Sequence, residues 1–349
     1  MLNIRFATRA DNEQLIALTA STPMLGTISL RIDRKPDFFR LLNERGDSNV
    51  LVAEVDGRIV GCISVSRQQV YINGQIHEVY YLGDFKIDSA HRGLRISLKM
   101  IDGLKQYAAS ANSDLFFCTA ADGNDPVFPF FDGRLEIPPF QYAGSFNVFQ
   151  FVAFKKKIRK NDFTMLEIPS GDELRQFLNH HYSNFQLGAV VNEGKLRHTT
   201  NIGLRSPAGQ LVGAICLQDT LPWKQNVVVG VSAGMKFLMR LAKLLRPVIG
   251  MSSLPELGQP VRMLYAKYFV AKDTFAAKQL IEYGRNLVYN KNYSFLALGV
   301  HEKDPLTAQV KGFPKFTFRS HAMITSLKKN QSLIDSIKRG VMYEDYSLV

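Results

Sequence analysis

Hydrophobic and polar positions alternate along Asn49–Arg67, NVLVAEVDGRIVGCISVSR, on both sides of Asp56-Gly57. Alternation interrupted by Asp-Gly is typical of a β-hairpin with a tight turn. Before it, Ile4–Thr19 predicts a strand followed by an amphipathic helix, and after it Asp114–Thr119 has the length of a buried strand. Strands and helices follow one another, which favours an α/β fold with a mixed sheet.

The second half repeats this order in a weaker form. The segment GQLVGAICL, in a hairpin predicted over Thr199–Leu217, echoes GRIVGCISV of the first half. A strand over Arg262–Val270 and a helix over Phe275–Tyr289 again form a strand-then-helix pair. Strands are also expected at Phe163–Ile168, Tyr293–Val300 and Lys315–Leu327, and helices at Asp172–His180 and Val231–Ile249. The chain is therefore predicted to contain two copies of one fold in tandem.

The segment Phe85–Tyr107, FKIDSAHRGLRISLKMIDGLKQY, contains an apolar strand that turns through Arg92-Gly93 directly into a helix. The first backbone N–H groups of a helix have no intrahelical partners and lie at the positive end of the helix dipole. Such a helix start can hold a phosphate group. The sequence therefore predicts a pyrophosphate site at this turn.

The stretch from Ile87 to Gly93 resembles the V-x-P-x-x-R-G sequence of GNAT N-acyltransferases, which bind acetyl-CoA at this turn. The family turn reads R/Q-x-x-G-x-G/A; Arg92 is present here, but Arg95 and Ser97 stand at the small positions. A small residue there lets the backbone approach the pyrophosphate, whereas a guanidinium can pair with phosphate through two hydrogen bonds. The resemblance implies a cofactor site made of Phe85, Lys86, Ile87, Arg92, Gly93, Leu94, Arg95, Ile96, Ser97 and Asn124.

Acyl transfer to an amine needs a base for the amine proton and a donor for the thioester oxygen. In enzymes that resemble this one the donor is backbone of the strand before the turn, here Gly83–Ile87. Asp84 and Glu78 are the candidate bases in reach of that strand. Strict alternation would place both on the face of Tyr80, with Tyr81 on the opposite face. An ion pair between Asp84 and a basic neighbour is an equally consistent interpretation.

The proton for the leaving thiolate comes, in many GNAT members, from the tyrosine of an N-x-x-A-x-x-x-Y-x-x-x-G-F segment. Asn124 matches its asparagine, which contacts the cofactor, but Phe131 stands at the tyrosine position. A phenyl ring cannot donate a proton. Tyr80, Tyr81 and Tyr142 are therefore the candidate acids.

The two predicted copies differ in charge. Residues 1–154 carry 15 Lys and Arg against 17 Asp and Glu, a net charge of −2, and the remaining residues carry 28 against 14, a net charge of +14. We expect a GNAT domain over 1–154, a basic linker over 155–162, a degenerate GNAT-like domain over 163–327 and a C-terminal tail over 328–349. The corresponding turn of the second copy, Ala271 to Thr274, lacks R-x-x-G, so one CoA per chain is expected.

The excess positive charge favours an acceptor with phosphate or carboxylate groups. The run from Lys155 to Lys160 is compatible with RNA or an acidic substrate, and also with a solvated linker. Because the small residues of the turn and the usual tyrosine are missing, a non-catalytic CoA- or RNA-binding module is an alternative function.

A hydrolase is a further alternative. Gly230–Gly234, GVSAG, has the G-x-S-x-G sequence of a nucleophile elbow between an apolar run and a helix, and Asp304 and His321 follow in hydrolase order. Ser232 is equally suited to be a helix N-cap, and the first half already resembles another fold. The hydrolase is therefore the weaker interpretation.

The remaining features concern compartment and metals. Cys62, Cys118 and Cys216 are widely spaced in apolar runs, which indicates buried thiols without a disulfide framework. His180-His181 has no His or Cys partner at metal-ligand spacing, so no metal is expected. The chain starts without an apolar leader and has no run of membrane-spanning length, so a cytoplasmic protein is expected.

These observations predict an acetyl-CoA-dependent N-acyltransferase that acts by direct attack of a small-molecule or peptide amine. The tail over 328–349 is expected to be a surface helix. Some multi-domain relatives, such as N-myristoyltransferase, instead place the carboxylate of the chain end in the active site as the base, which is the alternative for this tail.

Overall fold

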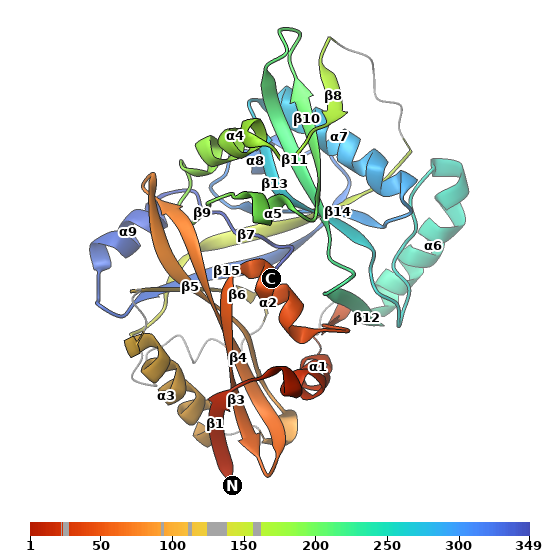
Figure 1. Cartoon of the computed structure of the whole chain (residues 1–349). Helices are drawn as coiled ribbons and strands as arrows, with labels where there is room; N and C mark the ends of the chain where they lie inside the picture. The colour runs from red at the N-terminus through yellow and green to blue at the C-terminus, as the bar shows by residue number, and fades with distance from the viewer. Residues whose placement is uncertain (22, 24–27, 92–93, 111–113, 124–137, 156–161) are drawn as a thin grey trace.

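The structure, a computed structural model, describes the chain except residues 22, 24–27, 92–93, 111–113, 124–137 and 156–161 (Figure 1). Its strands are β1 Leu2–Phe6, β2 Ile28–Asp33, β3 Asp47–Val55, β4 Arg58–Ile72, β5 Gln75–Ile87, β6 Leu115–Ala121, β7 Gln141–Val152, β8 Thr164–Glu167, β9 Gly188–Ala189, β10 Thr199–Arg205, β11 Leu211–Asp219, β12 Gln225–Val231, β13 Met263–Ala271, β14 Phe295–His301 and β15 Lys315–Ser326. Its α-helices are α1 Asn12–Ala20, α2 Phe38–Arg45, α3 Leu94–Ser110, α4 Asp172–Tyr182, α5 Glu193–Leu196, α6 Ala233–Ile249, α7 Thr274–Asn290, α8 Leu306–Gln309 and α9 Gln331–Arg339.

The predicted hairpin is present as β3 and β4, and the α/β fold class is confirmed. Asp56 and Gly57 form its turn with φ angles of 49° and 80°, the left-handed region that favours Asp-Gly. The predicted strand-then-helix pair of the second half is present as β13 and α7. Strand β2 and helix α2 were not predicted from the sequence, and β4 and β5 are longer than predicted.

One mixed sheet joins both halves of the described chain. Its strand order is β1-β3-β4-β5-β6-β15-β7-β14-β13-β11-β10-β8, with β9 paired to β4. The last strand, β15, therefore lies between β6 and β7 of the first half, and β7 in turn pairs with β14 of the second half. A separate two-stranded ribbon pairs β2 with β12. The two copies thus exchange strands instead of packing as separate bodies.

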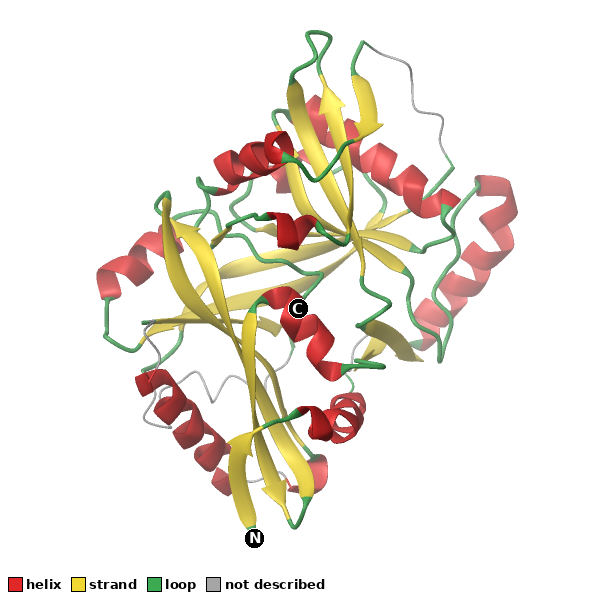
Figure 2. Ribbon diagram, in the orientation of Figure 1, coloured by secondary structure: helices red, strands yellow, loops and turns green. Residues whose placement is uncertain are grey.

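Helices cover both faces of each half of the sheet (Figure 2). In the first half, α3 packs on β1, β3 and β4, while α1 and α2 lie against the opposite face. In the second half, α7 packs on β11, β13 and β14, while α4 lies on the other face of β13. The position of α7 in the second half therefore corresponds to that of α3 in the first.

The sequence predicted a surface helix for the C-terminal tail over 328–349. In the structure the helix of this tail is α9, Gln331–Arg339, and the rest of the tail has a different course. After α9 the chain turns inward, and Met342, Glu344, Tyr346 and Leu348 are all buried. Leu348 packs in the apolar cluster under α1 and α2, and Tyr346 packs beside the ring of Phe146 on β7. The tail therefore lies between the two halves of the sheet (Figure 1).

We predict that Gly299→Ala will loosen this tail. A Cβ atom at Gly299 on β14 would overlap the ring of Tyr346, whereas a Cβ atom at Gly312 would have no neighbour within 4 Å. Overpacking of a filled core costs about 1–3 kcal/mol, so Gly299→Ala should lower the free energy of unfolding in urea by about that amount. Gly312→Ala is the matched control and should not destabilise. Equal stability of the two variants would contradict the placement of Tyr346.

Candidate acyl-transfer site

Strands β5 and β6 run parallel for only three residue pairs, from Val79–Leu115 to Tyr81–Phe117. Beyond Tyr81, β5 continues with β4 alone, and β6 continues with β15 on its other edge. The two strands therefore part, and their facing backbone groups past this point have no partner in the other strand. Strands β13 and β14 part in the same way after three parallel pairs, which supports the predicted repeat.

A bulge interrupts β5 just after the strands part. The register with β4 passes from the Ser64–Gly83 pair to the Cys62–Lys86 pair, so Asp84 and Phe85 together oppose one residue of β4. Asp84 has a φ angle of +50° at this position. A bulge leaves an extra residue outside the ladder and reverses the alternation of the side chains that follow it.

The bulge corrects the predicted faces of the strand. Phe85 packs with Tyr80 in the apolar cluster under α3, although alternation placed these two residues on opposite faces. Asp84 instead accepts hydrogen bonds from Arg34 and Ser64 on the α2 side, where the guanidinium of Arg34 also stacks on an α2 phenylalanine. The prediction that Asp84 shares a face with Tyr80 and Glu78 was therefore wrong. Asp84 lies on the face of Tyr81.

The two carboxylates predicted as bases are both held in ion pairs. Arg34 Nη1 lies 3.0 Å from Asp84 Oδ1; the side chain of Arg34 is buried, and that of Asp84 is 16% exposed. This guanidinium helps to hold the pKa of Asp84 below its usual value, against the opposing effect of burial. Glu78 lies 3.6 Å from Arg67 at the surface. The alternative interpretation of Asp84, an ion pair with a basic neighbour, is confirmed.

Tyr81 lies where the strands part. Its hydroxyl shares a hydrogen bond of 2.9 Å with Thr119 on β6, which bridges β5 and β6. Burial raises the pKa of Tyr81 well above its usual value. The guanidinium of Arg45, at the end of α2, lies 3.6 Å from the centre of the Tyr81 ring.

Arg45 connects Tyr81 to a carboxylate that the sequence analysis missed. Arg45 Nη1 donates to Glu344 Oε1 at 3.0 Å, and Arg45 also donates to the carbonyl of Leu348. Burial raises the pKa of Glu344 to about 7, although Arg45 opposes this effect. Nothing in the local sequence distinguishes Glu344 from an exposed glutamate of a tail, because its burial depends on the inward turn after α9.

A small cavity of about 40 Å³ lies beside this cluster. Its walls include Val79 and Phe117, which belong to the paired parts of β5 and β6, together with Arg45 and Glu344. Deeper in the same interior, buried Lys224 donates to the backbone carbonyl of Tyr346, and burial lowers the pKa of Lys224 to about 7. Buried ionisable groups are therefore concentrated between the two halves.

Tyr142, another predicted acid, lies on β7 and is half-exposed. Its hydroxyl hydrogen-bonds to Ser145 at 2.8 Å, Ser145 bonds to His321 Nδ1 at 3.1 Å, and His321 Nε2 bonds to Asp122 Oδ1 at 3.2 Å. Asp122 directly follows β6, at the end where β6 has parted from β5. The strand exchange that brings β15 beside β6 creates this chain of hydrogen bonds.

The cofactor turn is only partly described. Arg92, Gly93 and Asn124 lie outside the described residues, as does Phe131. Leu94 opens α3, and the side chain of Arg95 is exposed in its first turn, while Ser97 is buried. Phe85, Ile87 and Ile96 are partly buried and pack against the apolar cluster under α3. Lys86 is half-buried, and its backbone is paired with that of Cys62 on β4.

The second copy has a different helix start. The side chain of Asp273 caps α7 by accepting a hydrogen bond from Ala276 N at 2.8 Å. A carboxylate there uses an N–H group that a phosphate would need and repels the phosphate charge. This geometry agrees with the sequence-based interpretation that the second turn has lost its cofactor site.

The hydrolase alternative was wrong. Ser232 is the N-cap of α6, whereas the ring of His321 bonds to Ser145 and Asp122. Asp304 accepts from Leu306 N at the start of α8. His321 and Asp304 therefore hydrogen-bond to groups other than Ser232, which argues against a triad.

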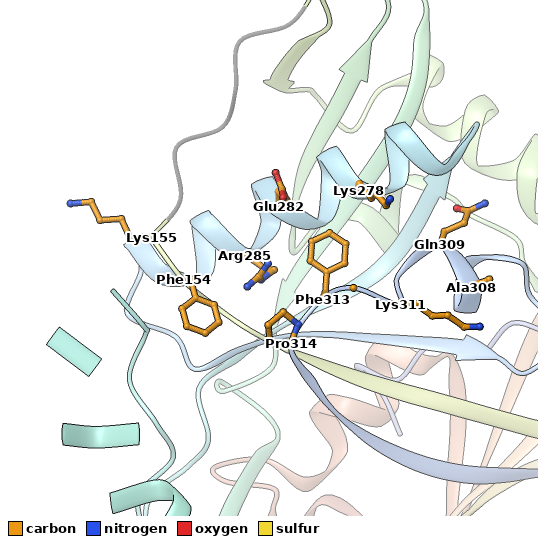
Figure 3. Close-up of a pocket in the computed structure, with 11 residues that line it drawn as sticks. Phe154, Lys155, Lys278, Glu282, Arg285, Ala308, Gln309, Lys311, Phe313 and Pro314 are labelled. Carbon is orange, nitrogen blue, oxygen red and sulfur yellow. The ribbon is translucent and has the colours of Figure 1, made fainter. Parts of the chain in front are cut away.

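A larger hollow of about 530 Å³ lies in the second half, between α7, α8 and the end of β7 (Figure 3). Lys155, Lys278 and Lys311 line it and are exposed. Arg285 is buried at its wall, where its guanidinium lies 5.4 Å and 5.3 Å from the ring centres of Phe154 and Phe313. With Glu282 as the one acidic residue of the lining, the hollow is positively charged.

Residues 13–134 match the model of the acetyltransferase (GNAT) family. A comparison with curated protein sequences gives no significant match.

Several solved structures share the fold of the chain. They include N-myristoyltransferase of Saccharomyces cerevisiae with bound myristoyl-CoA, with a TM-score of 0.62 and 10% identity over 93% of this chain and 78% of that one. A GCN5-related N-acetyltransferase of Anabaena variabilis has a TM-score of 0.54 and 10% identity over 93% and 72%. A probable N-acyltransferase of Enterococcus faecalis has a TM-score of 0.52 and 9% identity over 94% and 73%. Residues 13–134 thus resemble the GNAT family, and the chain as a whole has a fold of two GNAT-like copies in tandem.

Proposed function

We propose that the protein is an N-acyltransferase that takes acetyl-CoA as donor and transfers the acetyl group to an amine by direct attack. The observation that carries the proposal is the parting of β5 from β6 at the bulge, directly before the turn into α3. Backbone N–H groups of Gly83–Ile87 on the side of β5 away from β4 face the place where β6 has parted, and there they can donate to a thioester oxygen as it gains charge. The start of α3, with Arg95 exposed, can hold the pyrophosphate.

A short acyl group fits the space beside this point. The cavity lined by Val79, Phe117 and Glu344 measures about 40 Å³, which is room for roughly three water molecules at ~10–15 Å³ each. Two or three heavy atoms of an acetyl group would fill it. A long acyl chain would need the surrounding core to move, which supports acetyl-CoA over longer donors.

The raised pKa values of two nearby cysteine thiols support direct transfer. Cys118 lies on β6 immediately after the last parallel pair, and burial raises its pKa well above the usual value. Burial likewise raises the pKa of Cys62 to about 12. Because the thiolate and not the thiol is the nucleophile, neither cysteine is suited to form an acyl-enzyme intermediate.

Glu344 is the base in this proposal. It lines the cavity that the acetyl group would fill, so an amine that attacks the thioester carbon would approach beside its carboxylate. A pKa of about 7 suits a base that must accept a proton near neutral pH. Asp84 is less suited, because Arg34 and Ser64 already occupy its oxygens.

Tyr142 is the proposed acid for the leaving thiolate. The hydrogen bonds from Tyr142 through Ser145 and His321 to Asp122 give its hydroxyl a route by which a donated proton can be replaced. Tyr81, on the face of Glu344, is better placed to orient the amine through its bridge to Thr119. Base and acid then act from opposite sides of the thioester.

The acceptor is proposed to be an anionic amine. The positively charged hollow of the second half would attract phosphate or carboxylate groups (Figure 3). A non-catalytic CoA- or RNA-binding module is the second candidate, and the Arg285 stack in the hollow is the observation that favours it. An acetyl-transfer assay over anionic and neutral amines separates the two candidates, because only the enzyme releases CoA.

We predict one CoA site per chain, at α3. Arg95→Ala should weaken CoA binding by about 1.5–3 kcal/mol, because it removes charge-assisted hydrogen bonds to phosphate. Lys272→Ala, at the corresponding turn of the second copy, is the matched control and should bind CoA as the unmodified protein does. Titration calorimetry measures both the affinity and the stoichiometry. Two equal sites, or unchanged affinity in Arg95→Ala, would exclude α3 as the single site.

We predict that Glu344→Gln will remove an inflection near pH 7 from the pH dependence of kcat/KM. The carboxyl group is protonated below its pKa of about 7 and accepts a proton only above it, so activity should rise through this pH and then level off. Loss of a general base lowers the rate by roughly 10²–10⁴-fold. Stopped assays across roughly pH 5.5–9 test this prediction. This range extends about 1.5–2 pH units to each side of neutrality.

Asp84→Asn is the control for this experiment. It leaves Arg34 buried without its carboxylate, which should cost about 3 kcal/mol of stability, but the inflection near neutral pH should persist. If Glu344→Gln keeps the inflection, or if Asp84→Asn loses it, Glu344 is not the base.

A further inference from the structure

Helix α6 carries an apolar stripe that faces solvent. Phe237, Leu241, Leu244 and Val248 have exposed fractions of 67%, 45%, 75% and 84%. Their spacing of four, three and four residues places them on one face of a helix. Large apolar side chains scattered singly over a surface are ordinary, but a contiguous row indicates an interaction site.

A row of cations runs beside this stripe. Lys236, Arg240 and Lys243 are exposed, and each directly precedes one of the apolar residues, so the row lies about 100° around the helix from the stripe. Together with Arg246, the helix contains four basic residues and no acidic residue. Met235 and Met239 are half-buried and lie on a different side of the helix from the apolar stripe. The outward surface of α6 is therefore apolar along one half and basic along the other, where Lys243 Nζ lies 3.2 Å from Glu256 Oε1.

The position of α6 leaves this surface accessible. Figure 1 shows the helix at the margin of the molecule, beyond the β2–β12 ribbon, and opposite the end that carries α9. No described side chain of α6 is fully buried, although the helix is rich in apolar residues. With 17 residues the helix is about 26 Å long.

We propose that α6 docks the protein on an anionic lipid surface. An apolar row with Lys and Arg beside it is the pattern of a helix that lies in the plane of a membrane interface, with its apolar side chains among the acyl chains and its cations at the phosphates. The absence of acidic residues from the helix matches a negatively charged surface and argues against a second copy of this same basic face, because like charges would meet. In the described chain, no helix is long and apolar enough to cross a bilayer, so α6 lies on the surface.

The proposal is independent of the acyl-transfer reaction. Its test is flotation of the full-length protein with vesicles of phosphatidylcholine alone and of phosphatidylcholine mixed with phosphatidylglycerol. The protein should float with the mixed vesicles, should float little with the neutral ones, and should be released as salt is raised, because screening weakens the attraction of the cations.

Two variants separate the apolar row from the basic row. Leu244→Glu and the double change Arg240→Glu with Lys243→Glu should each lower vesicle binding at least tenfold. Ile76→Glu, at another apolar side chain that is 56% exposed, and Lys328→Glu with Lys329→Glu, which removes the same charge near α9, should bind as the unmodified protein does. Circular dichroism confirms that each variant is folded.

Two outcomes would overturn the proposal. Equal binding of Leu244→Glu and the unmodified protein would show that the stripe does not enter the lipid. A concentration-dependent dimer in sedimentation velocity that Leu244→Glu abolishes, with no flotation of the unmodified protein, would show that a second copy covers the stripe.

Discussion

The pairing of β15 with β6 is the interaction on which the rest of the structure depends. It places a strand from the end of the chain inside the first copy, on the edge of β6 that faces away from β5. With that edge occupied, β6 is held in place while β5 diverges from it after Tyr81. The same exchange gives β7 to the second copy and draws the tail between the two halves. One long-range pairing thus accompanies both the parting of β5 from β6 and the inward course of the tail that carries Glu344.

The partners of the buried carboxylates in this interior explain why their pKa values differ. A buried ion is tolerated when a partner and hydrogen bonds compensate for lost solvation. Asp84 has both, through Arg34 and Ser64, and stays ionised as a structural group. Glu344 has Arg45 but is more weakly compensated, so its pKa is near neutrality. Two carboxylates on one side of the sheet are therefore suited to different tasks, and the difference lies in their partners.

The second copy shows how a duplicated fold can diverge. It keeps the parting of two parallel strands and the helix that follows, but Asp273 caps that helix where a phosphate would bind. Its surface has become basic, with a positively charged hollow on α7 and a basic and apolar surface on α6. The first copy, in contrast, combines the parted strands with a helix start that has Arg95 exposed in its first turn.

The sequence by itself determined the α/β class, the hairpin at Asp56-Gly57 and the repeated strand-helix order, because each depends on local periodicity or turn chemistry. It also predicted that a helix follows β5, and α3 is that helix. Only the tertiary structure decided which face Asp84 occupies, because a bulge shifts the alternation and leaves no local signal. Likewise, the strand exchange, the burial of Glu344 and the exposure of α6 arise from contacts between residues far apart in the chain, which periodicity cannot encode.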